Sequence, residues 1–170
     1  NNIHPKSLNE LKLNDGFNKI WEWSSLWNAE SYNKRLKNLS TCLKGSIDSK
    51  MSIKGYWSLY LFPFVQISST EGLSFSIQIF DPCTSSLSEK TNFHTYIYSP
   101  KLKFKSRDRG SFQAYYEAAK KLNFQVFDED REICSRVPLS SWSFSPLNYS
   151  SELEIKINHF RKCCREALNL

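Results

Sequence analysis

The chain has 170 residues, of which 40% are hydrophobic and 15% aromatic, with 23 lysines and arginines against 17 aspartates and glutamates. This composition is typical of a single globular domain, residues 1–170, and excludes a collagen, a coiled coil and a disordered tail. The longest apolar stretch, residues 59–65, contains Pro63 and is far shorter than the about 20 residues that cross a bilayer, so we expect no membrane partner. Asn1 stands where an initiator methionine or a secretory signal would begin, which indicates a trimmed chain or an excised piece.

Positive charge is concentrated in one segment. The formal net charge is +6 and the pI is near 9.0, which favours acidic partners such as nucleic acid. Residues 101–109 hold two thirds of this excess, because they contain five cations and one anion: Lys101, Lys103, Lys105, Arg107 and Arg109 against Asp108. We expect one basic surface rather than a diffusely charged protein.

The five cysteines indicate a reducing compartment. An odd number cannot pair completely within one monomer, and their spacing fits no zinc motif. Reduced thiols and a cytoplasmic location follow as expectations. Of the adjacent Cys163 and Cys164, at least one is expected to pack as a small hydrophobic residue.

The front of the chain, residues 1–50, is predicted to be helical. Ser7 can cap a helical segment that reaches Trp27, with a break near Gly16. A second helix is predicted from the spacing of Tyr32, Leu36, Leu39 and Leu43, and Gly45 follows it as a C-cap.

The body, residues 53–170, begins with strands. Residues 56–62 read as a mostly buried strand that continues after Pro63 through residues 64–67, and residues 68–72 read as a turn. Residues 73–79 alternate apolar and polar side chains, as expected for a half-buried strand, and residues 93–98 form a third alternating segment.

The second half of the body adds helices. Ser111 is predicted to cap a helix that ends at Leu122, followed by a hairpin over residues 124–137 with its acidic turn at 128–130. Ser150 or Ser151 is predicted to cap a final amphipathic helix whose apolar positions are Leu153, Ile157, Phe160, Cys164 and Ala167. The sum is an α+β fold: a mostly antiparallel sheet of about five strands with N-terminal helices, one inserted helix and a C-terminal helix.

The strongest candidate site is the basic segment. If it is extended, Lys101, Lys103 and Lys105 lie on one face about 7 Å apart, which matches the spacing of backbone phosphates, and Arg107 and Arg109 add forked donors. Tyr96 and Tyr98 lie just upstream, where they can stack on bases or donate hydroxyls, although packing is the ordinary role of such residues. The alternative is an edge strand protected by lysines, and the two interpretations are compatible.

Two other sets of residues bear on partners. Basic residues on two predicted helices either widen the basic surface or form ordinary solvated faces: Lys34, Arg35, Lys37, Arg161, Lys162 and Arg165. Trp21, Trp23 and Trp27 belong to a core or helix-to-sheet contact, or, if exposed, to a site for a protein partner.

No catalytic motif stands out. Glu154 and Lys156 have the E-x-K spacing of metal-dependent nucleases, but helical spacing around them turns the two side chains apart by about 200°. His159 and Cys163 have the i, i+4 spacing of a thiol–imidazole pair without a third residue to orient them. Phosphate-binding glycine motifs are absent, so we assign no catalytic residue, metal or cofactor, and whether the protein is an enzyme stays open.

From Leu73 to Leu168, the order of strands, helix, acidic-turn hairpin, Trp-containing loop and final helix is similar to an uncharacterised prokaryotic domain family that accompanies restriction-type nucleases and other phage-defence proteins. The residues that carry this resemblance are Phe124 to Asp128 and Ser135-Arg136-Val137. The resemblance implies a role in DNA transactions and assigns no functional residue.

The sequence therefore favours a non-catalytic module that binds nucleic acid, with DNA as the expected partner, within a restriction or phage-defence system. A protein-interaction module, such as an immunity or adaptor protein that binds an acidic partner, is the alternative. A divergent metal-dependent nuclease using Glu154 or Asp81 is a third interpretation.

Overall fold

The computed structural model describes residues 16–31, 33–47, 54–82, 91–103, 107–137 and 155–169. Their strands and helices, in chain order, are β1 (Phe17–Ile20), β2 (Ser24–Ala29), α2 (Lys34–Lys44), β3 (Tyr56–Leu61), β4 (Val65–Thr70), β5 (Ser74–Pro82), β6 (Thr91–Tyr98), α3 (Arg109–Arg136) and α5 (Ile155–Leu168). The strands form one sheet in the order β1 to β6, and every neighbouring pair is antiparallel. The predicted α+β class is confirmed, with six strands rather than about five.

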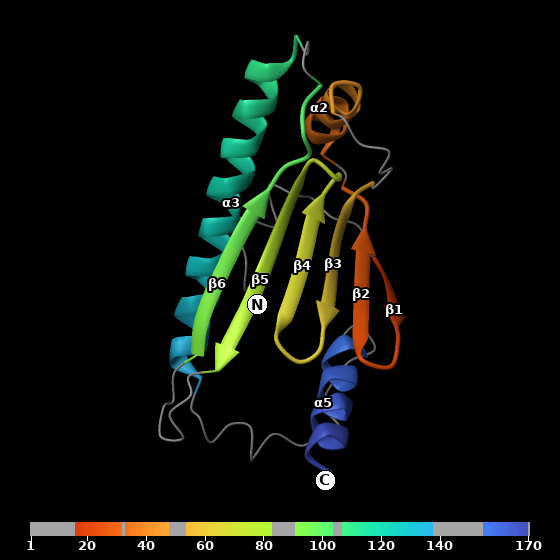
Figure 1. Cartoon of the computed structure of the whole chain (residues 1–170), viewed down its shortest axis with the longest axis vertical. Coiled ribbons are helices and arrows are strands. Elements are labelled where there is room, and N and C mark those ends of the chain that lie inside the picture. The colour runs from red at the N-terminus through yellow and green to blue at the C-terminus, as the bar shows by residue number, and fades with distance from the viewer. Residues whose placement is uncertain are drawn as a thin grey trace.

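The helices lie around the sheet in distinct places (Figure 1). α2 lies across one end of the sheet, α3 runs along its β6 edge, and α5 lies at the opposite end from α2. No helix in the described parts of the chain is long and apolar enough to cross a membrane.

The predicted helix across residues 17–27 is wrong, because these residues form the β1–β2 hairpin. Trp21 donates its amide to the Ser24 carbonyl at 2.9 Å to close the turn, and β2 pairs along its whole length with β3. Each residue of β2 thus gains a partner in a strand about 30 residues away, and this tertiary pairing outweighs the helical spacing of the apolar residues. The front of the chain is therefore part of the same sheet as the body, and the proposed cap Ser7 lies outside the described residues.

The second predicted helix is confirmed as α2. The Asn33 side chain accepts hydrogen bonds from the amides of Arg35 and Leu36 and so caps the first turn. Gly45 forms the C-cap as predicted, although with right-handed rather than left-handed backbone geometry (φ −64°).

The predicted hairpin over residues 124–137 is also wrong. α3 continues without interruption from Arg109 to Arg136 because neither glycine nor proline occurs after Gly110, and because side chains pair along its surface at helical spacing. Asp128 pairs with Arg131 at 3.0 Å, and Arg136 pairs with Glu132. The acidic residues that predicted a turn are thus part of an ion-paired helix surface.

The final helix is confirmed as α5, but its buried face differs from the predicted one. Ile157 is 45% exposed and Ala167 is exposed, whereas Cys163 is completely buried and Lys156 is half-buried. Phe160 contacts Tyr60 edge-on, with ring centroids 5.5 Å apart, which places the helix against β3. The predicted caps Ser150 and Ser151, and Leu153, lie outside the described residues.

The two faces of the sheet are chemically unequal. α3 and α5 pack on the same face, since Phe93 contacts Phe127 and Tyr60 contacts Phe160, and the registers place Phe93 and Tyr60 on one face. This helix-covered face carries the buried side chains of Ser58, Ser68 and Ser76. The predicted alternation is present from Ser74 on, but its polar residues are the buried set, and Phe75, Ile77 and Ile79 are on the other face.

The apolar core lies where α2, α3 and the β4–β5 turn meet. Its buried members are Leu43, Ile47, Leu73, Phe112 and Tyr115. The Tyr115 hydroxyl donates to the Thr70 carbonyl at 3.1 Å, so its polar end is satisfied within the core. This cluster fixes the end of the sheet to both helices.

Replacing a central residue of this core should destabilise the whole domain. Phe112 is 4% exposed, so Phe112→Ala should lower the free energy of unfolding by about 3–5 kcal/mol, because apolar burial is removed and a cavity is left behind. Phe124→Ala on the same helix, where the side chain is 52% exposed, should cost about 1 kcal/mol or less. Urea denaturation of both variants measures the difference, and equal destabilisation would contradict this position of the core.

Candidate nucleic-acid interface

The basic segment is attached to α2 rather than to the sheet edge. After β6 ends at Tyr98, Leu102 forms an isolated antiparallel bridge with Ile47, and the Lys103 amide donates to the Ser46 carbonyl at 2.9 Å. The Ser46 hydroxyl and the Asp108 carboxylate form a further hydrogen bond across the same junction. The edge strand is β6 itself, so Lys101 and Lys103 do not protect it in the way that the alternative interpretation predicts.

The predicted alternation holds over the described lysines. Lys101 and Lys103 are exposed, and Leu102 between them is half-buried against the core. The Lys103 ammonium donates to the Gly45 carbonyl at 2.7 Å, which places a cation at the C-terminal end of α2, where the helix dipole favours it. Lys105 lies outside the described residues.

Arg107 and Arg109 lie at the beginning of α3. Both side chains are exposed, and the N-cap Asp108 makes no side-chain cap hydrogen bond. The unpaired amides and the helix dipole make this end of a 28-residue helix electropositive in addition to the two guanidinium groups. Cations and helix terminus thus reinforce one another at one place.

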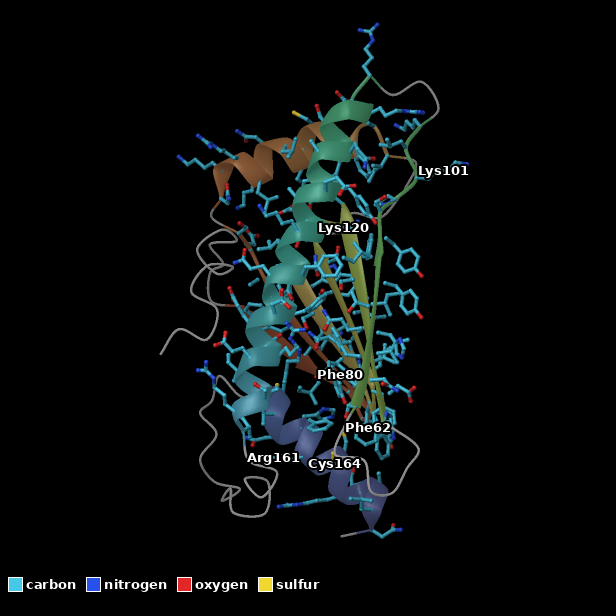
Figure 2. All side chains as sticks on the ribbon, turned by 90° about the vertical axis from the view of Figure 1, so that its left-hand side faces the viewer. Phe62, Phe80, Lys101, Lys120, Arg161 and Cys164 are labelled. Carbon is cyan, nitrogen blue, oxygen red and sulfur yellow. The ribbon has the colours of Figure 1, made fainter. Side chains whose placement is uncertain are left out.

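Tyr96 and Tyr98 lie on the face of the sheet away from α3. They are 48% and 52% exposed and point away from α3, opposite Thr95 and Ile97, as strand parity predicts. Figure 2 shows Lys101 beyond the end of β6, on the side of the sheet away from α3. Lys101 thus lies on the same side of the sheet as the two tyrosines, and base stacking by the tyrosines stays a prediction.

Basic residues of α2 and its surroundings join the same end of the molecule. We call this region the basic end, and define it by nine cations and three anions: Lys34, Arg35, Lys37, Lys44, Lys54, Lys101, Lys103, Arg107 and Arg109, with Glu30, Glu71 and Asp108. Two of these anions are committed to ion pairs, Glu30 with Lys37 and Glu71 with Lys44, each at 3.3 Å. The sequence separation of α2 from residues 101–109 concealed this grouping, which the Ile47–Leu102 bridge creates.

The opposite half of α3 is acidic. Its last turns carry Asp128, Glu129, Asp130 and Glu132 against Arg131 and Arg136. α5 lies at the same end of the molecule and carries Lys156, Arg161, Lys162 and Arg165 against Glu166, so this end as a whole is not acidic (Figure 1). Because α5 lies at the opposite end from α2, its cations Arg161, Lys162 and Arg165 do not widen the basic end.

Lys156, the lysine of the E-x-K spacing, is partly buried between α5 and the sheet. Its ammonium donates to the Ser58 carbonyl at 3.2 Å, and burial lowers its pKa to about 8. α5 is a helix from Ile155 onward, as the apolar spacing predicts, which differs from the strand that nuclease E-x-K motifs occupy. Glu154 lies outside the described residues.

His159 and Cys163 are close to each other, with the thiol sulfur 3.5 Å from Nε2. Both also contact the Glu22 carbonyl oxygen, at 3.1 Å from Nε2 and 3.4 Å from the sulfur. Burial raises the pKa of the Cys163 thiol, which disfavours the thiolate that nucleophilic catalysis requires. The pair thus fixes α5 to the β1–β2 turn, and Cys163 packs as the predicted small buried residue.

Neither a metal centre nor a relative among known proteins accounts for this arrangement. Among the residues that the structure describes, no group of three His, Cys, Asp or Glu side chains is placed to hold a metal ion. The fold defines an α+β protein with a six-stranded antiparallel meander. No family model, curated protein or solved structure matches the chain significantly. The resemblance of residues 73–168 to the phage-defence domain family stays a prediction, and the hairpin that contributed to it is part of α3.

The partial burial of Lys156 should appear as a pH-dependent stability. Its pKa falls from 10.5 to about 8 on folding, so the native state releases this proton at a lower pH than the unfolded state does. The free energy of unfolding should therefore rise as the pH increases above about 8. Above about pH 9 the thiols of Cys163, which is buried, and Cys164, which is partly buried, oppose this gain, because burial raises their pKa values from 9.0.

Lys156→Met should remove the rise and stabilise the protein at neutral pH by about 1–2 kcal/mol, after allowance for the solvent that still reaches the ammonium. Urea denaturation at about pH 7 and about pH 9 measures both effects. Lys162→Met, an exposed position on the same helix, is the matched control. A variant at position 156 with the wild-type pH dependence would contradict this assignment.

Proposed function

We propose that the protein binds nucleic acid, with duplex DNA as the expected partner, through the basic end, and that it does so without catalysis. The observation that carries this proposal is the meeting of α2, residues 101–103 and the beginning of α3, which combines nine cations with three anions. Phosphate contacts supply most of the affinity of non-specific DNA binding, and a cluster of exposed lysines and arginines suits them.

The exposed cations are available for phosphates at different positions around this end. Lys34, Arg35, Lys101, Arg107 and Arg109 are exposed, and the described part of the chain provides no carboxylate ion pair for any of them. These cations come from α2, from the segment that follows β6 and from the beginning of α3. Their side chains can therefore contact phosphates along the curved backbone of a duplex rather than phosphates in one straight row. Lys105 belongs to the proposed contact on the sequence alone.

Removing three of these cations should weaken binding to all DNA sequences alike. We expect the Lys101→Ala/Arg107→Ala/Arg109→Ala variant to bind about tenfold or more weakly at about 0.1 M salt. The slope of log affinity against log salt should flatten by about 0.9 for each phosphate that the variant no longer neutralises. Fluorescence anisotropy titrations of a short labelled duplex over a series of salt concentrations provide both quantities.

A charge-matched variant at the other end distinguishes a site from net charge. Arg131→Ala/Arg136→Ala/Lys162→Ala removes the same charge from the surface of α3 and α5 and should leave the salt slope unchanged. Equal weakening in the two triple variants would show that only the overall charge matters. Absence of binding to duplex and single strand alike at low salt would overturn the proposal.

The exposed tryptophans of the β1–β2 turn support a second candidate, a protein-interaction module. Trp21 and Trp23 are each 41% exposed, and exposed tryptophans are typical of interface anchors. Trp27 does not belong to this surface, since its ring packs on Tyr56. A stoichiometric protein complex that survives nuclease treatment and is abolished in Trp21→Ala/Trp23→Ala would favour this candidate.

A further inference from the structure

The sheet face opposite α3 and α5, which we call the open face, carries three cross-strand rows of mainly apolar side chains. The registers align the middle row completely across the sheet, from β1 to β6: Lys19, Leu26, Leu59, Ile67, Ile77 and Tyr96. One neighbouring row contains Trp57 and Phe75, whose ring centroids are 6.2 Å apart. The other contains Leu61, Val65 and Ile79.

This face is apolar where soluble monomers are usually polar. Its four central aliphatic side chains are only half-buried, and among its outer members Leu61 is 37% and Phe17 is 59% exposed. Ser58, Ser68 and Ser76 of the central strands lie on the helix-covered face, whereas the polar side chains of the open face stand in its two outer rows, among them Asn28 and Ser69. Burying serines while leaving isoleucines half-exposed is unfavourable for an isolated sheet. Removing apolar side-chain area from water lowers the free energy of the folded protein, whereas removing a polar hydroxyl from water costs free energy unless it is hydrogen-bonded.

The area is sufficient for a specific interface. Six strands about 4.8 Å apart and three rows about 7 Å apart cover roughly 500 Å² of sheet. Two such faces in contact remove roughly 1,000 Å² from water, which is the lower limit of stable interfaces. A contiguous apolar patch of about this size on a protein surface is typical of a contact site.

We propose that the open face is the interface of a homodimer, in which two sheets pack face to face at about 10 Å, as in a β-sandwich. The four central side chains of the middle row, Leu26, Leu59, Ile67 and Ile77, carry neither charge nor hydrogen-bonding group, which suits an identical apolar face and not a polyanion. A two-fold axis through the centre brings Ile67 and its neighbours against the same residues of the other copy.

The residues at the two ends of the middle row, Lys19 and Tyr96, indicate the direction of the two-fold axis. An axis perpendicular to the strands brings Lys19 of one copy against Lys19 of the other, which is repulsive. An axis parallel to the strands instead brings Lys19 against Tyr96, across the two edges of the sheet. The Lys19 ammonium already lies 4.9 Å from the centroid of the Trp21 ring, and a tyrosine ring on its other side provides a second cation–π contact.

This arrangement places the basic ends of both copies at the same end of the dimer, because rotation about an axis parallel to the strands preserves position along the strands. The dimer itself rests on the apolar face and does not depend on nucleic-acid binding. The homodimer and the binding of nucleic acid are therefore tested independently, and a negative result for one does not contradict the other.

Sedimentation equilibrium of the full chain tests the dimer directly. The wild-type protein should sediment at twice 19.9 kDa in the micromolar range. Ile67→Glu places two carboxylates together near the axis and should weaken association by at least about 100-fold. Val137→Glu changes an apolar side chain that is 53% exposed at the end of α3, and should leave the dimer intact. A monomeric wild-type protein, or a folded Ile67→Glu variant that still dimerises, would overturn the proposal.

Variants at Tyr96 test the axis and remain informative if Ile67→Glu fails to fold, since Tyr96 is 48% exposed. Tyr96→Glu should preserve the dimer by pairing with Lys19 of the other copy, whereas Tyr96→Lys should weaken association by about tenfold or more. Equal weakening by both would overturn the parallel axis, and no effect of either variant would overturn the contact between these edges. Circular dichroism verifies that each variant is folded.

Discussion

The junction at the α2 end of the sheet determines where the cations of the basic end lie. Leu43, Leu73 and Phe112 meet there from α2, the β4–β5 turn and α3, and exclude water from the point where three segments cross. Glu71 lies in the turn itself with a left-handed backbone (φ 56°) and is 5% exposed. Its carboxylate accepts a hydrogen bond from Ser40 and pairs with Lys44, so α2 compensates the buried charge. The cations of the basic end are close together because this junction holds α2 against residues 101–103.

The second constraint is the period of two along each strand. Once the helices cover one face, every residue of the six strands is assigned to one side or the other, and a shift of register by one residue would exchange them. The registers place Ser58, Ser68 and Ser76 on the face that α3 and α5 cover, and the branched aliphatic residues on the open face. Burying a serine costs less when its hydroxyl has a hydrogen-bond partner, as Ser58 does by accepting from the Gln66 side chain at 3.0 Å. The unusual distribution therefore follows from the pairing of the strands, and its cost is recovered only if the aliphatic face is covered.

Local patterns predicted those elements whose partners are close in sequence. β5, β6 and α2 were identified in this way, because alternation marks the two strands and helical spacing marks α2. The prediction for residues 56–72 was wrong in part, since the chain reverses at residues 62–64 into the β3–β4 hairpin and residues 68–70 belong to β4 rather than to a turn. β1 and β2 were missed because apolar residues at three- and four-residue intervals between Phe17 and Trp27 imitate a helix, while their actual stability comes from pairing with β3. The acidic run at 128–130 predicted a turn, whereas its ion pair with Arg131 supports a helix. Of the candidate site, charge density identified residues 101–109, but the contribution of α2 depends on the Ile47–Leu102 bridge, which joins residues 55 positions apart.

The two proposed surfaces are arranged so that one can strengthen the other. Few cations of a single copy are available to phosphates, and a small cluster of this kind binds DNA weakly at physiological salt. If two copies associate through the open face with their basic ends together, the second cluster meets the same nucleic acid at a high effective concentration, and the affinities combine without any new contact. Association of the apolar faces is only weakly sensitive to salt, whereas the phosphate contacts are strongly sensitive. Salt therefore separates the two contributions, and a protein with these two surfaces would remain a dimer under conditions in which it has released its polyanion.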